Sequence, residues 1–307
     1  MKIIAKSGFY ITALIILAVF SSCEKDESSD QKNSDNFEYP RDKPGPDVFF
    51  KIGRRGEEFR FDDIALYDSS THILYFKNEH NEFSEIEQGS FYFLDNGETI
   101  YSGSFYPGYS SYIPAGPIIL TAPHLYGNYA LRVEIWRDDK PDVRNCPRII
   151  EILKAHNLLH SGLSGRVDFV EINGDQISFG FTIVNHDLTD LLIIDLNKTG
   201  PNLFHYFTNG LYLRTEDHNE IFSSTIEHQT PEPWNIWKPE WLTTLKSGES
   251  ISFTINYPIE QSIPQGDYSL LFEFPGLAYQ VSREDLFQGS DRIWLGDITL
   301  RDRITIQ

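Results

Sequence analysis

Two histidines stand four residues apart in the middle of the chain, a spacing that metal sites on helices use. His156 and His160 lie in a segment that predicts a helix, so both imidazoles would project from one face. A zinc-peptidase motif also needs a glutamate directly after the first histidine, and Asn157 stands there. Apolar residues share this face, so we expect a buried His156 and a His160 near the helix C-terminus, where positive charge is favoured. We therefore predict no metal site.

The remaining sequence contains no catalytic motif. Cys146 precedes His156 by ten residues, which along a helix is about 15 Å and too far for a thiolate and its base. No G-x-S-x-G elbow, Walker loop or dinucleotide fingerprint occurs. We expect a non-enzymatic protein without a cofactor. A hydrolase whose carboxylates come from separate loops stays open as an alternative, because one sequence does not show which acids face each other across a cleft.

Three tryptophans fall within eight residues of a proline-rich segment. TPEPWNIWKPEWLTTL contains Trp234, Trp237 and Trp241, and its prolines keep the segment off a central strand. Two of these indoles, if exposed and rigid, would form a platform for sugar rings or an extended peptide. Alternatively, they fill the open end of a β-sandwich, which the usual burial of large rings favours. All three are candidate binding residues.

A second candidate region is YSGSFYPGYSSYIPAGP, from Tyr101 to Pro117. It combines rigid aromatic rings with adaptable polar residues, as recognition loops do, and its binding candidates are Tyr106, Tyr109 and Tyr112. The alternative is an ordinary long loop whose tyrosines pack on a sheet.

Short β-rich runs separated by turn signals follow one another from residue 49 onward, which is typical of all-β domains. Asn96-Gly97 and Asn173-Gly174 each separate two such runs and predict tight hairpins, because Asn-Gly supplies the positive φ angles of a type I′ turn. The chain should therefore be mainly β.

One segment between the two blocks of strands has a different pattern. NCPRIIEILKAHNLLHSG predicts a helix of three to four turns, with Pro147 in the first turn and Gly162 as a left-handed cap. We predict two β-sandwich domains, 47–145 and 163–307, joined by this helix at 146–162.

The segment from Lys246 to Phe274, KSGESISFTINYPIEQSIPQGDYSLLFEF, is similar to the paired late strands of bacterial immunoglobulin-like modules, including the proteinase-inhibitor type. The resemblance implies an immunoglobulin-like sandwich for the C-terminal domain. It also adds proteinase inhibition as a further functional alternative, although such a fold hosts many functions.

The N-terminus has the layout of an export signal. Lys2 and Lys6 precede an apolar stretch that is shorter than the roughly 20 residues of a membrane helix. Ser21 and Ser22 then lead into Cys23, and here the segment resembles a bacterial lipoprotein signal with its lipobox. The resemblance implies cleavage of a signal peptide, 1–22, and acylation of Cys23. An ordinary secretory signal followed by an incidental cysteine is the alternative.

The stretch after the signal peptide, 23–46, is charged and poor in aliphatic residues, and it predicts a disordered acidic tether. Its first acids resemble the surface-export signals of Bacteroidetes lipoproteins. The resemblance implies a lipid-anchored outer-membrane protein at the cell surface. A plain solvated spacer is the alternative, and a protein that faces the periplasm stays open.

Charge narrows the choice of partners. Cleavage after residue 22 would remove two lysines and no acids, so the formal net charge of −19 would become −21. Nucleic-acid phosphates demand a basic surface, so we exclude nucleic acid as a partner. The sequence predicts an anchored binding module, held on the membrane by its lipid, whose loops contact a glycan or an envelope protein.

Overall fold

The computed structural model describes residues 44–53, 56–111, 114–136, 141–215, 221–224, 226–259 and 263–306. Within these ranges strands dominate and two α-helices occur, so the predicted mainly β fold is confirmed. The predicted signal peptide, the lipidation site Cys23 and the binding candidate Tyr112 lie outside the described residues. No helix of the described ranges is long and apolar enough to cross a membrane.

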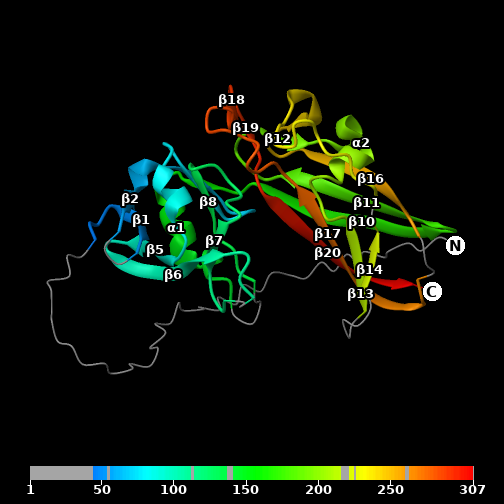
Figure 1. Cartoon of the computed structure of the whole chain (residues 1–307), viewed down its shortest axis with the longest axis horizontal. Helices are drawn as coiled ribbons and strands as arrows, with labels where there is room; N and C mark the ends of the chain where they lie inside the picture. The colour runs from blue at the N-terminus through cyan, green and yellow to red at the C-terminus, as the bar shows by residue number, and fades with distance from the viewer. Residues whose placement is uncertain are drawn as a thin grey trace, which may run out of the picture.

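The N-terminal part of the chain forms two sheets that pack face to face (Figure 1). The first has the order β2-β1-β5-β6-β7, with strands β1 (Val48–Ile52), β2 (Glu58–Arg60), β5 (Gly89–Asp95), β6 (Glu98–Pro107) and β7 (Ile118–Ala122). The second has the order β8-β4-β3-β9, with strands β3 (Ile64–Asp68), β4 (Ile73–Phe76), β8 (Ala130–Arg132) and β9 (Leu159–His160). Phenylalanine rings join the sheets, with centroids 6.1 Å apart for Phe50 and Phe76.

Three further sheets form the C-terminal part. One has the order β10-β11-β16, with β10 (Leu163–Asn173), β11 (Gln176–Asn185) and β16 (Ser250–Pro258). The second has the order β14-β13-β17-β20, with β13 (Leu211–Thr215), β14 (Ile221–Ser224), β17 (Gly266–Pro275) and β20 (Asp297–Ile306). The third has the order β15-β12-β19-β18, with β12 (Leu191–Ile194), β15 (Leu242–Leu245), β18 (Phe287–Gln288) and β19 (Asp291–Ile293). The first two pack face to face, since the Phe179 and Phe272 rings lie 5.0 Å apart.

Both predicted hairpins form. In the β5–β6 hairpin, Asn96 (φ 51°) and Gly97 (φ 75°) occupy the two turn positions, as the sequence predicted for a type I′ turn. In the β10–β11 hairpin, Asn173 pairs with Gln176, so the turn residues are Gly174 and Asp175 rather than Asn173 and Gly174. The second turn is therefore shifted by one residue, with Gly174 (φ 62°) at its first central position.

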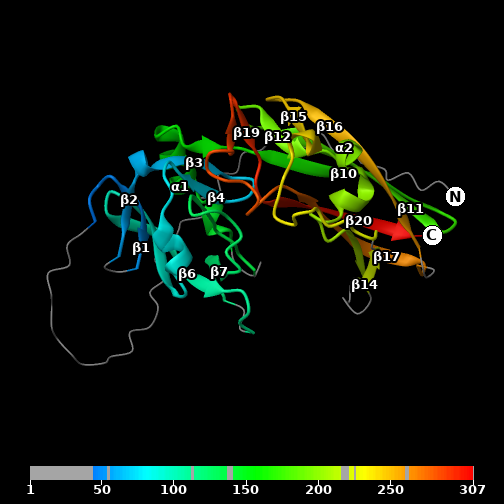
Figure 2. The same cartoon turned by 45° about the horizontal axis from the view of Figure 1, so that its top comes forward.

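Two α-helices, α1 (Pro147–Ala155) and α2 (Leu196–Phe204), accompany the strands, together with the short 3-10 helices η1 (Phe61–Asp63), η2 (Asn81–Glu85), η3 (Val143–Asn145) and η4 (Pro239–Trp241). Helix α1 is shorter than predicted, because Asn157 adopts a left-handed conformation (φ 56°) that ends it. Gly162 is therefore no helix cap. Ile149 and Leu153 bury α1 in the N-terminal core, and Figures 1 and 2 show the helix within the N-terminal part.

The β8-β4-β3-β9 sheet contributes to two hydrophobic cores. On one face, Leu74 and Phe76 pack with the rings of the five-stranded sheet. On the other, Leu66, Ile73 and Tyr75 pack in the same cluster as the C-terminal strands. The two parts thus share a buried apolar surface, and the division at residues 146–162 into separate immunoglobulin-like domains stays a prediction.

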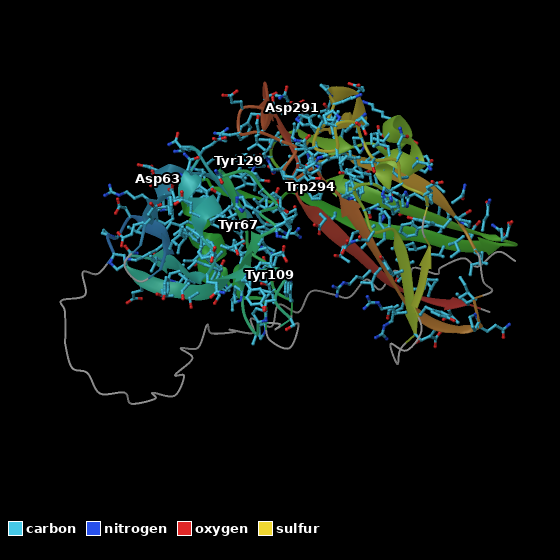
Figure 3. All side chains as sticks on the ribbon, viewed as in Figure 1. Asp63, Tyr67, Tyr109, Tyr129, Asp291 and Trp294 are labelled. Atoms are coloured by element: carbon cyan, nitrogen blue, oxygen red, sulfur yellow. The ribbon has the colours of Figure 1, made fainter. Side chains whose placement is uncertain are left out.

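A buried ion cluster also joins the two parts. Arg292 of β19 donates from Nη2 to Asp68 Oδ2 at 2.8 Å and to Asp187 Oδ2 at 3.1 Å. All three side chains are at most 1% exposed. Figures 1 and 2 both place β19 at the boundary of the two parts, and Figure 3 shows Trp294 there.

Candidate functional site

The three tryptophans of the proline-rich segment do not share one environment. Trp234 is 58% exposed, whereas Trp237 is half-buried against the C-terminal core and Trp241 is 8% exposed. Of the three indoles only Trp234 is exposed, so the three do not form a platform among themselves. Trp241 is buried, as the alternative placement expects.

Helix α2 positions the chain beside Trp234. Asp195 caps the helix by accepting from the Asn197 amide at 2.9 Å, and Phe204 is buried at the other end. The next residue, His205, is fixed on both sides, because Nδ1 lies 2.7 Å from the Pro201 carbonyl oxygen and Nε2 lies 3.0 Å from the Tyr257 hydroxyl. Tyr206 thus leaves the helix end in a defined direction.

Hydrogen bonds hold the tryptophan segment against this helix. Asn202 of α2 donates from Nδ2 to the Glu227 carbonyl at 2.8 Å and accepts at its own carbonyl from the Gln229 amide at 2.9 Å. The Tyr206 hydroxyl then donates to the Trp234 carbonyl at 3.0 Å. The backbone around Trp234 is fixed although its indole is exposed.

Tyr279 completes the exposed aromatic group. Its ring, 40% exposed, lies 5.4 Å from the Trp234 ring at an angle of 51°, and its hydroxyl lies 3.3 Å from that of Tyr206. The His228 ring lies near that of Tyr206, with 6.3 Å between the ring centroids. We call Tyr206, His228, Trp234 and Tyr279 the Trp234 surface.

In the Trp234 surface, the Tyr279 hydroxyl donates to the Tyr206 hydroxyl, which donates to the Trp234 carbonyl. Because Tyr206 donates its proton to the Trp234 carbonyl, the Tyr279 hydroxyl is the donor between the two phenols. Partial burial, with the neighbouring Tyr206 hydroxyl, raises the pKa of Tyr279 to about 12, so it keeps its proton at neutral pH. The surface thus combines exposed ring faces with hydroxyl groups, the pairing suited to ligands that are apolar on one side and polar on the other.

Residues of the tyrosine-rich segment belong to a separate group of aromatic side chains on the N-terminal part. Tyr109 is 80% exposed just after β6, where Figure 3 shows it at the edge of that part. Tyr106 is half-buried and meets the edge of Trp136 with a centroid distance of 6.0 Å. Trp136 is itself 40% exposed, and its Nε1 donates to Glu134 Oε2 at 2.7 Å.

The predicted burial of His156 and the predicted helical position of His160 are both wrong. His156 caps α1 and is exposed, with its ring stacked on Phe61 at 3.7 Å, rather than buried. His160 lies in β9, not on the helix, and donates from Nδ1 to Asp187 Oδ1 at 2.8 Å. The described residues contain no group of three or more His, Cys, Asp or Glu side chains arranged to hold a metal ion.

Sequence reasoning missed Tyr206, His228 and Tyr279. Tyr206 directly follows the residues that end α2, so the helix end could have placed it. Tyr279 comes 45 positions after Trp234 in the chain, and no local pattern links the two.

No family model matches the chain, and no curated protein matches it. Among solved structures, a β-glucosidase from Kluyveromyces marxianus aligns with 47% of the chain at 8% identity and a TM-score of 0.24. The same enzyme in complex with glucose gives a TM-score of 0.23. The chain spans only 14% of the length of that enzyme.

The yjhA protein from Bacillus subtilis aligns with 46% of the chain and over 92% of its own length, at 16% identity and a TM-score of 0.23. Similarities this low do not bear on the function of the chain, and the candidate site therefore depends on its own geometry.

Proposed function

We propose that this chain is a lipid-anchored binding protein of the outer membrane that recognises glycans through the Trp234 surface. The observation that carries the proposal is the exposed Trp234–Tyr279 ring pair on a hydrogen-bonded frame. Exposed aromatic rings that lie together on a fixed backbone favour an interaction site, because a partner that covers them removes apolar surface from water. Sugar rings match it because they present an apolar C–H face and a polar rim of hydroxyls.

Rigidity supports binding in preference to a plain surface patch. Tyr206, Asn202 and His205 fix the backbone around Trp234, so this backbone loses little conformational entropy when a ligand docks. A protein ligand of the envelope would engage the same rings and is the runner-up partner.

The lipid anchor, the tether and the two domains set the position of the Trp234 surface relative to the membrane. Cys23 carries the lipid, 23–46 is the tether, and two immunoglobulin-like sandwiches, 47–145 and 163–307, present the surface outside the cell. Two or three acyl chains suffice for stable anchoring, because each buried methylene contributes about 0.8 kcal/mol. No catalytic role is proposed.

A glycan array probed with the full chain tests the recognition step. The wild-type chain should bind a defined set of glycans, and Trp234→Ala should lose them. Trp136→Ala is the matched control, since Trp136 is also an exposed indole but lies on the N-terminal part. An array on which the wild-type chain binds no glycan, or on which both variants bind like the wild type, excludes the proposal.

A further inference from the structure

A polar pocket lies between the two parts of the chain, away from the Trp234 surface. Its volume is about 370 Å³, at the lower end of ligand pockets in proteins. Ten residues line it and eight of them are polar or charged. His72, Arg132 and Arg144 come from the N-terminal part, and Ser164 and Asp297 come from β10 and β20. We call it the junction pocket.

Both arginines of the junction pocket are paired with carboxylates. Arg132 donates two hydrogen bonds to Asp297, from Nη1 to Oδ2 at 2.5 Å and from Nη2 to Oδ1 at 3.0 Å, and these bonds connect β8 to β20. Arg144 likewise donates two hydrogen bonds to Asp142, from Nε to Oδ1 at 2.9 Å and from Nη2 to Oδ2 at 2.8 Å. Such bidentate pairs fix both partners, so the lining is organised before a ligand arrives.

The pairing leaves the junction pocket polar but without free charge. Each of the two guanidinium groups is hydrogen-bonded to a carboxylate. Burial, aided by the charge of Arg144, lowers the pKa of His72 to about 3, so its imidazole is uncharged at neutral pH. His72 Nδ1 lies 2.8 Å from the Tyr67 hydroxyl. An anion would have to displace Asp297 or Asp142 from its arginine, and a cation would meet both arginines.

The lining keeps hydrogen-bonding capacity for a ligand although its charges are paired. Ser164 and Thr299 are exposed members of the lining, and each carries a hydroxyl group that can both donate and accept. The paired Asp297 carboxylate also retains lone pairs that accept from further hydroxyl groups.

We propose that the junction pocket binds an uncharged polyhydroxylated ligand of about the size of one sugar ring. Hydroxyl groups both donate and accept, so they can pair with Ser164, Thr299 and Asp297 without breaking either ion pair. The site is separate from the Trp234 surface and does not depend on glycan recognition there.

Isothermal titration of the full chain with glucose, galactose, mannose and N-acetylglucosamine tests the proposal, with glucuronate and glucose 6-phosphate as charged counterparts. At least one neutral sugar should bind, and the charged sugars should bind at least ~10-fold more weakly. Thr299→Trp, at an exposed position of β20 in the pocket lining, should weaken that binding by ~10-fold or more by filling the space. Thr254→Trp, on the exposed face of β16, is the matched control, and it and Trp234→Ala should bind like the wild type.

The assignment is overturned if none of the neutral sugars binds, or if the charged sugars bind as tightly as the neutral ones. It is also overturned if a Thr299→Trp chain with a wild-type melting temperature binds the neutral sugar unchanged. If Thr299→Trp does not fold, Ser164→Trp on β10 also fills the pocket, and its binding of the neutral sugar is interpreted in the same way. A neutral sugar that is lost in Trp234→Ala but retained in Thr299→Trp belongs to the Trp234 surface and also counts against the junction pocket.

Discussion

Arg292 and Asp68 stand 224 positions apart in the chain, yet Nη2 of the arginine donates to Oδ2 of the aspartate at 2.8 Å inside the protein. Asp187 accepts from the same nitrogen at 3.1 Å. The cluster thus links β19, the end of β3 and the loop after β11, and it lies in the surface that the two parts of the chain bury together.

Arg292→Met should destabilise the protein strongly. The substitution leaves two buried carboxylates without their cation, and removing one partner of a buried pair costs about 3–5 kcal/mol. Urea unfolding followed by circular dichroism measures the free energy of unfolding. Arg166→Met is the control, because its pair with Asp168 is exposed and such a pair contributes about 0–1 kcal/mol. Equal losses for the two variants would contradict the structural role of Arg292.

Stability should fall in acid because of Asp187. Burial alone would raise the pKa of this carboxyl, but the hydrogen bond from His160 and the charge of Arg292 lower it to about 2. A group whose pKa is depressed on folding stabilises the protein above its unfolded value, near 4, and loses that contribution as the pH falls toward 2.

Urea unfolding at a series of pH values measures this effect. The free energy of unfolding of the wild type should decline from about pH 4 toward pH 2, and Asp187→Asn should decline less over the same window. Identical slopes for the two proteins would show that Asp187 does not titrate as described.

Gly162 should tolerate no side chain. It has φ +63°, and a Cβ there would collide with Ser70 Oγ and Asp68 Oδ1. We expect Gly162→Ala to cost at least about 2 kcal/mol, from the left-handed backbone and the collision together. Gly174→Ala measures the backbone contribution alone, because Gly174 has φ +62° and no atom lies near its Cβ position. This substitution should cost about 1–2 kcal/mol. Thermal unfolding compares the two, and similar losses would contradict the close packing at Gly162.

The local features of this fold could be predicted from the sequence. Alternating runs predicted the strands, and Asn96-Gly97 predicted a hairpin turn, because both signals act between neighbouring residues. The length of α1 was overestimated, since apolar spacing continues to Leu159 while Asn157 turns left-handed and ends the helix. The left-handed conformation of Asn157 therefore determines where the helix ends, although the apolar spacing continues beyond it.

The candidate site was predictable only in part. The proline-rich segment indicated indoles on a loop, but the division among an exposed Trp234, a half-buried Trp237 and a buried Trp241 depends on which core each ring can reach. Tyr206 and Tyr279 meet Trp234 through tertiary packing of α2 and the loop after β17. The junction pocket depends on Arg132 and Asp297, which are 165 positions apart.

Lipidation of Cys23 has a direct chemical test. Cells that express the full chain should incorporate labelled palmitate into it, and Cys23→Ser should abolish the label because no other thiol occupies the end of the signal segment. Cys146→Ser is the matched control and should keep the label, since that thiol is buried at the start of α1. A labelled Cys23→Ser protein would disprove the anchor.

The affinity of the Trp234 surface for the glycan that the array selects tests the central claim most directly. The dissociation constant should rise at least ~10-fold in Trp234→Ala, because the exposed indole supplies the main contact area. It should stay unchanged in Trp136→Ala. Equal dissociation constants for the wild type and Trp234→Ala would contradict the account.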